Sequence, residues 1–152
     1  MIEIQSNPIL DEKLDEGLLA RAARVVLENQ SASQNVSLSI LMTNDAQIQS
    51  LNRKYRGFDA PTDVLSFDVH EYDPETDTLY LGEIIISVPY AAKQAQKNGH
   101  PLEAEVQLLV VHGVLHILGH DHAKAEEKSK MWDAQNEILA HLGLAEMKIQ
   151  EL

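Results

Sequence analysis

The chain contains no cysteine among its 152 residues. Disulfide bonds and thiolate metal ligands are therefore excluded, and this composition fits a protein of the reducing cytoplasm. No apolar run approaches the length of about 18 residues that a membrane-spanning helix requires. The first residues have no basic segment followed by an apolar core, so we expect no signal peptide. These absences predict a cytoplasmic protein with no membrane partner.

Positive charge is also scarce, because 12 lysine and arginine residues face 24 aspartate and glutamate residues, giving a net charge of −12. Proteins that bind nucleic acid without selectivity usually carry a basic surface, so general binding to polyanions is not expected, and DNA is not expected as a partner. A polyanion would have to be held at a local positive site. Arg53, Lys54 and Arg56 form the compact basic group of the sequence.

The length predicts a single domain, residues 1–152, with a sizeable apolar core. Alternating apolar residues predict strands at 2–5 and 36–42. Residues 64–69 read as a third strand, and the apolar run at 79–88 predicts a fourth that is covered on both faces, with an acidic turn region at 70–77 between them. Apolar residues at helical spacing, with capping and breaking residues, predict helices at 11–29, 45–55, 89–98, 101–118 and 124–142. This order predicts an α+β fold: a mixed sheet of about four strands packed with about five helices.

Four of the seven histidines fall within residues 112–122. His112 and His116 are four residues apart, which places both rings on the same face of a helix. Gly119 can end this helix in a left-handed conformation, so that His122 can return toward the two helical rings. Three neutral imidazoles that converge on one point are typical of a divalent metal site, for which zinc is the default ion. Because the helix is apolar on most sides, we expect the metal site on a central, buried helix.

The residues around the three histidines leave alternatives open. His120 lies in the predicted turn, and we expect it to line the site or face solvent. Asp121 either orients a ligating ring or caps the following helix. The zincin peptidases carry His-Glu-x-x-His with the glutamate as general base, but that position is Gly113 here. The pattern therefore favours metal-dependent hydrolysis without that base and disfavours a peptidase.

Arg56 stands at the end of a predicted helix, beside a loop that leads into a strand. Its guanidinium can clamp a phosphate with two hydrogen bonds, or it can simply compensate the C-terminal end of the helix. Longer motifs surround both sites. They read Leu51-Asn52-x-x-Tyr55-Arg56, Pro61-Thr62-Asp63-Val64-Leu65-Ser66-Phe67, Leu81-Gly82-Glu83-Ile84 with Ser87, and His112-Gly113-x-Leu115-His116-x-x-Gly119-x-Asp121-His122. Together they resemble the bacterial YbeY family of metal-dependent endoribonucleases.

The resemblance implies that His112, His116 and His122 bind one zinc ion and that Arg56 takes part in RNA cleavage. It implies action on single-stranded RNA, maturation of the 3′ end of the small-subunit ribosomal RNA, ribosome quality control, and the ribosome or ribosomal proteins as partners. The chain departs from the family pattern at Glu83, where aspartate is usual, and at His120, where tyrosine is frequent.

Several questions remain open on the sequence alone. The general base is unassigned among metal hydroxide, the RNA 2′-hydroxyl, His120 and Glu83. Nickel, iron or manganese could occupy the same histidines. A ribosome-assembly binding factor with a structural metal, and a metallohydrolase of small phosphoesters or peptides, are the alternative functions. Because the chain is acidic, we expect the ribosome or a protein partner to supply much of the targeting.

Overall fold

The computed structural model describes residues 1–10, 13–32 and 34–145. The predicted α+β class is confirmed, with four strands and five helices in these residues. In chain order the elements are β1 Ile2–Ser6, α1 Glu16–Asn29, β2 Val36–Thr43, α2 Asp45–Arg56, β3 Val64–Asp73, β4 Thr78–Ser87, α3 Val88–Asn98, α4 Leu102–Ile117 and α5 Ala125–His141.

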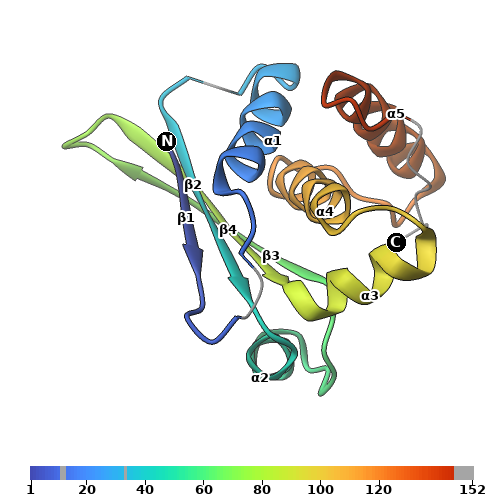
Figure 1. The fold of residues 1–152 in the computed structure, drawn as a ribbon. Helices are drawn as coiled ribbons and strands as arrows, with labels where there is room; N and C mark the ends of the chain where they lie inside the picture. The colour runs from blue at the N-terminus through green and yellow to red at the C-terminus, as the bar shows by residue number, and fades with distance from the viewer. Residues whose placement is uncertain (11–12, 33, 146–152) are drawn as a thin grey trace.

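The four strands form one mixed sheet in the order β1-β2-β4-β3. β2 pairs in parallel with both β1 and β4, whereas β3 and β4 form an antiparallel hairpin. The far end of this hairpin extends beyond the helical layer in Figure 1. Since β3 is the last strand in this order, it lies at an edge of the sheet, and one side of its backbone is not paired with another strand.

The helices cover the two faces of the sheet unequally. Figure 1 shows α1, α4 and α5 together on one side, with α2 apart from them at the other end of the view. α4 is the central helix of the larger layer, since it contacts α1, α3, α5, β3 and β4. Thirteen of its 16 residues are buried. The prediction of a central, buried helix is thus confirmed for the helix that carries His112 and His116.

A second, smaller core lies on the opposite face of the sheet. Ile48 of α2 packs there against Leu65 of β3 and Ile85 of β4. Ile84 and Ile86 belong instead to the main core with α4. Alternate residues of β4 therefore point to opposite layers, as the pleat of a strand requires. This alternation decides which side chains of β3 and β4 can reach the histidines.

Two predicted boundaries were wrong. α1 begins at Glu16 instead of residue 11, because Asp15 accepts a hydrogen bond from the Gly17 amide at 2.9 Å and caps the helix. Residues 11 and 12 of the predicted helix lie outside the described residues. β3 runs on to Asp73 instead of ending at residue 69, because pairing with β4 resumes after a bulge between Asp68 and Glu71. The other boundaries of the helices and strands agree with prediction to within one residue.

None of the helices in the described residues is both long enough and apolar enough to cross a bilayer.

Candidate metal centre and the cleft around it

The last two turns of α4 bring His112 and His116 together. Their Nε2 atoms lie 3.0 Å apart, and the ring centroids are 4.5 Å apart. α4 ends at Ile117, and Gly119 follows with a left-handed φ of 100°. This turn, predicted from the glycine, sends the chain back so that the His122 ring lies 5.3 Å from His116 and 6.0 Å from His112 by centroid. The three predicted histidines therefore meet at one place.

The donor set fits a divalent metal ion. One nitrogen from each of the three rings lies within 4.8 Å of the other two. Two nitrogens bound tetrahedrally at a zinc–nitrogen distance of about 2.0–2.1 Å would be separated by about 3.3 Å. The observed 3.0 Å between the Nε2 atoms of His112 and His116 is close to that spacing. This cluster could therefore hold a metal ion after only small movements of the rings.

Gln135 of α5 fixes the orientation of the most buried ring. Its Oε1 lies 3.3 Å from Nδ1 of His112, and both side chains are buried. An amide oxygen can only accept, so this contact places a proton on Nδ1 and leaves the Nε2 lone pair facing the cluster. Sequence reasoning missed Gln135, because nothing in the sequence shows which residue of α5 faces α4 at this level.

The environment keeps the imidazoles of His112 and His116 neutral. Burial, followed by the neighbouring His116, lowers the pKa of His112 to about 4, although the hydrogen bond to Gln135 acts in the opposite direction. Burial and then His122 also lower the pKa of His116, against the raising effect of Asp121 and Asp68. Neutral imidazole is the form that binds a metal ion, so these two side chains are ready to ligate at neutral pH.

His120 lies beside the cluster without joining it. Its Nε2 is 2.7 Å from Oε1 of Gln30, at the end of α1, and its ring lines the same cleft as the other three. The expectation that His120 lines the site agrees with this placement. Burial and the nearby Lys130 lower the pKa of His120.

Asp121 follows neither predicted alternative. Its Oδ1 accepts hydrogen bonds from the backbone amides of His122 at 2.7 Å and Ala123 at 3.3 Å. The N-cap residue of α5 is Lys124, so Asp121 does not cap that helix, and its hydrogen bonds go to backbone rather than to a ring. Asp121 therefore holds the turn that carries His122.

Gly113, at the position of the zincin glutamate, has little room for a side chain. A Cβ atom at this position would lie 3.1 Å from Cγ2 of Ile84 and 3.1 Å from Oγ of Ser66. Ser66 Oγ also donates a hydrogen bond to the Gly113 carbonyl at 3.4 Å. α4 thus packs directly on β3 and β4 at this point. A side chain at 113 would point into the sheet instead of into the cleft.

Arg56 lies in the same cleft as the histidines. The cleft has a volume of about 820 Å³. Nη2 of Arg56 donates to the carbonyl of Ser66 on the edge strand at 2.6 Å, and the guanidinium carbon lies 5.5 Å from the centroid of the Phe67 ring. The residues that line the cleft are Asn52, Arg56, Phe58, Thr62, Asp63, Val64, Leu65, Ser66, Asp68, His112, His116, Gly119, His120, Asp121 and His122.

The structure separates two acidic residues of the hairpin. Glu83 pairs with Phe67 across β3 and β4 and alternates with Ile84, which faces α4. Glu83 therefore belongs to the layer of α2, and it is not among the residues that line the cleft. Asp68 does line the cleft and acts on the pKa of His116. Sequence reasoning named Glu83 and missed Asp68, because it did not establish which face of each strand packs on α4; Asp68 shares the face of Ser66, which contacts Gly113 of that helix.

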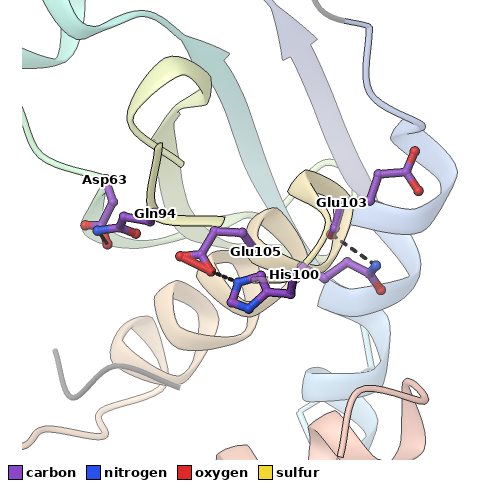
Figure 2. Close-up of polar contacts among 6 residues, drawn as sticks. Asp63, Gln94, His100, Glu103 and Glu105 are labelled. Atoms are coloured by element: carbon purple, nitrogen blue, oxygen red, sulfur yellow. Dashed lines mark hydrogen bonds and ion pairs between the residues drawn. The ribbon is translucent and has the colours of Figure 1, made fainter. Parts of the chain in front are cut away.

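Asp63 is held at the start of β3 by residues outside the cleft. Figure 2 shows the Gln94 amide beside the Asp63 carboxylate, and Nε2 of Gln94 donates to Oδ2 at 3.3 Å. The same view shows His100 against Glu105, with 2.6 Å between Nε2 and Oε2. Burial raises the pKa of Glu105, while His100 lowers it. His100 thus lies in the loop after α3 and pairs away from the histidine cluster.

These features define a class of protein: an α+β domain whose central helix and following turn form a three-histidine metal-binding cluster in an open cleft. Comparison with known proteins identifies the family. The family model described as Endoribonuclease YbeY matches residues 1–143. The chain belongs to the YbeY endoribonuclease family, as the sequence motifs indicated.

Individual relatives agree over most of their lengths. The chain is 44% identical to the Endoribonuclease YbeY of Pelotomaculum thermopropionicum over 144 residues, covering 93% of this chain and 94% of the relative. It is 44% identical to that of Moorella thermoacetica over 151 residues, covering 91% and 96%. The solution structure of TM1509 from Thermotoga maritima is similar, with a TM-score of 0.60, 25% identity and coverage of 100% of this chain and 99% of that one.

Proposed function

We propose that this chain, residues 1–152, is a zinc-dependent endoribonuclease that cleaves single-stranded RNA. We further propose that it acts in the cytoplasm on ribosomal RNA, at the 3′ end of the small-subunit RNA and in ribosome quality control, with the ribosome or ribosomal proteins as partners. Membership of the YbeY endoribonuclease family supports the reaction class. The observation that carries the proposal is the presence of Arg56 and the three histidines in one cleft.

His112, His116 and His122 are the proposed metal ligands. Their donor set contains only imidazole nitrogen, which suits zinc and leaves room in the coordination shell for substrate or water. Zinc bound there would supply positive charge and Lewis acidity beside the scissile phosphodiester. The protein contributes the fixed Nδ1–H of His112, held by Gln135, and the turn held by Asp121.

Arg56 is the proposed catalytic cation. A phosphodiester gains negative charge on its non-bridging oxygens as the attacking group adds, and a fixed guanidinium stabilises that charge. The Ser66 carbonyl and the Phe67 ring hold Arg56 at the cleft wall, so little side-chain entropy is lost when a phosphate binds. The guanidinium has further N–H groups with which to donate to the phosphate.

The placement of the acidic residues narrows the choice of general base. Glu83 belongs to the other layer of the domain, which argues against a role for it in proton transfer. His120 and Asp68 line the cleft, and the lowered pKa of His120 keeps its ring able to accept a proton at neutral pH. The attacking nucleophile could be water or the 2′-hydroxyl of the RNA itself. If the 2′-hydroxyl attacks, DNA would resist cleavage even where it binds, because it lacks that group.

The proposal is tested by incubating the purified protein with a single-stranded RNA, the same RNA as a duplex, and a DNA of the same sequence. We expect cleavage of the single-stranded RNA alone, loss of cleavage with a chelator, and recovery when zinc is added back. His116→Ala should abolish recovery. Circular dichroism in the chelator reports whether the fold survives. An unfolded apo-protein would favour the structural-metal alternative, and RNA cleavage that persists without metal would refute the proposal.

A further inference from the structure

An exposed phenylalanine stands at the wall of the cleft. The Phe58 side chain is 69% exposed, yet Phe58 lines the same cleft as Arg56 and the three histidines. Isolated apolar residues on a surface are ordinary and need no explanation. Phe58, however, exposes a large aromatic ring inside a site proposed to bind RNA. Such a ring can have a function there, because unpaired bases commonly stack on aromatic side chains.

The loop that carries Phe58 is held in place. Gly57 ends α2 with a φ of 77°, and the Phe58 amide donates to the carbonyl of Asn52 at 3.4 Å. Nδ2 of the buried Asn52 also donates to the carbonyl of Ala60 at 2.9 Å. Nε2 of Gln49 donates to the Asp59 carboxylate at 3.1 Å. These bonds fix the backbone on both sides of Phe58, so the ring is presented from a preorganised loop.

The cleft offers little positive charge to attract the phosphates of an RNA strand, so uncharged contacts must supply much of the binding. Among the cleft-lining residues, all of which lie in the described part of the chain, Arg56 is the only lysine or arginine. The cleft lining also includes three carboxylates, those of Asp63, Asp68 and Asp121. The whole chain has a net charge of −12. Stacking of a base on an aromatic ring does not depend on charge and contributes roughly five- to 100-fold in affinity per base.

We propose that the Phe58 ring stacks against one unpaired nucleobase of the RNA strand and so strengthens binding of the strand in the cleft that holds Arg56 and the histidine cluster. The inference rests on the proposed function and adds to it a reason for selecting single-stranded RNA. Bases in a duplex are stacked on their neighbours, and their faces are not available to Phe58.

The test separates binding from chemistry. Phe58→Ala in the zinc-loaded full chain is expected to raise the KM for a single-stranded RNA roughly tenfold while kcat changes by less than about twofold. Phe58→Trp should restore the wild-type KM, because tryptophan also offers a ring face. Tyr72→Ala is the matched control, since Tyr72 is 57% exposed but does not line the cleft. This control should leave both constants unchanged.

Substrates that lack one base identify the contact directly. A series of oligonucleotides, each with a single abasic nucleotide, should include one whose KM with wild-type protein rises roughly tenfold. Phe58→Ala should bind that oligonucleotide no more weakly than the intact one. An unchanged KM for Phe58→Ala with intact RNA would overturn the stacking role while leaving the nuclease proposal standing. Absence of RNA cleavage by the wild type would instead refute the proposed function itself.

Discussion

Oε1 of Gln135 lies 3.3 Å from Nδ1 of His112, so a residue of α5 sets the tautomer of a ring on α4. This contact turns the Nε2 lone pair of His112 toward His116 and His122. The orientation of one proposed ligand therefore depends on how α5 packs against α4. Metal affinity and the docking of α5 should be coupled for this reason.

Replacing Gln135 should weaken metal binding more than it weakens the fold. Gln135→Met keeps the side-chain volume but removes the acceptor, and we expect zinc affinity to fall roughly 10- to 100-fold in calorimetric titration. Gln107→Met is the matched control. Gln107 is also buried, but its amide donates to the carbonyl of Glu103 on its own helix. Equal zinc affinities for the two variants would contradict the role given to Gln135.

Arg56→Ala is expected to lower kcat for RNA cleavage by about 100- to 1,000-fold, since a fixed donor to developing charge is lost. Arg56→Lys should recover only part of that loss, because an ammonium group lacks the planar fork of the guanidinium. Arg53→Ala provides the control, since Arg53 lies in the same last turn of α2 but does not line the cleft. A similar loss of kcat in Arg53→Ala would show that general charge, not position, is responsible.

Gly113→Ala should destabilise the protein even though alanine favours helices. The added Cβ would lie 3.1 Å from Ile84 and Ser66, and such overpacking costs about 1–3 kcal/mol in the free energy of unfolding. Gly113→Glu should cost more and should create no peptidase activity, because its carboxylate would face the sheet. Urea denaturation measures both. Gly17→Ala is the comparison at an exposed helical glycine. The added Cβ would lie 3.0 Å from Oδ1 of Asp15, an exposed side chain that can move aside, so we expect a change of less than about 1 kcal/mol.

The metal-free protein should lose stability as the pH falls below that of neutral solution. The pKa of His112 is lowered to about 4 in the folded state, whereas an unfolded histidine has a pKa of about 6.5. The unfolded chain therefore binds the proton more tightly. The contribution of the neutral ring is complete above about pH 6.5 and is lost as the pH falls toward 4.

Between pH 7 and pH 5 this effect should lower the free energy of unfolding by about 2 kcal/mol for His112 alone. Urea unfolding in the presence of a chelator measures it. His112→Gln should show a weaker dependence on pH, while the exposed His141→Gln should behave like the wild type. Identical stabilities of the wild type at the two pH values would contradict the assignment of a buried, neutral His112.

Local sequence signals predicted the helix that carries the site. Pro101 precedes α4 and Gly119 follows it with a left-handed φ, so both ends of the helix were visible in the sequence. The spacing of His112 and His116 then placed both rings on one face, because that geometry depends only on the helical repeat. The return of His122 followed from the same glycine. These features are local, and local preferences were sufficient to find them.

The contributions that sequence reasoning missed are long-range. Gln135 is 23 residues from His112, and only the packing of α5 on α4 brings the two together. The end of β3 was missed because most of its outer half is exposed and carries no alternation of apolar residues, so pairing with β4 alone defines it. Asp68 and Glu83 were misjudged for a related reason. Alternation separates the two faces of each strand, but only the packing of the sheet shows that the face of Ser66 and Asp68 meets α4, whereas the face of Glu83 and Ile85 meets α2.

The proposed ligands come from two kinds of structure. His112 and His116 belong to a packed helix, whereas His122 belongs to the short turn before α5. A cation held by all three would fasten that turn to the helix, and its binding energy would be spent on ordering the junction between α4 and α5. Metal supply would then control the rigidity of one corner of the domain while leaving the sheet unaltered. Amide hydrogen exchange should accordingly slow at residues 119–124 on loading, with little change in β1 and β2.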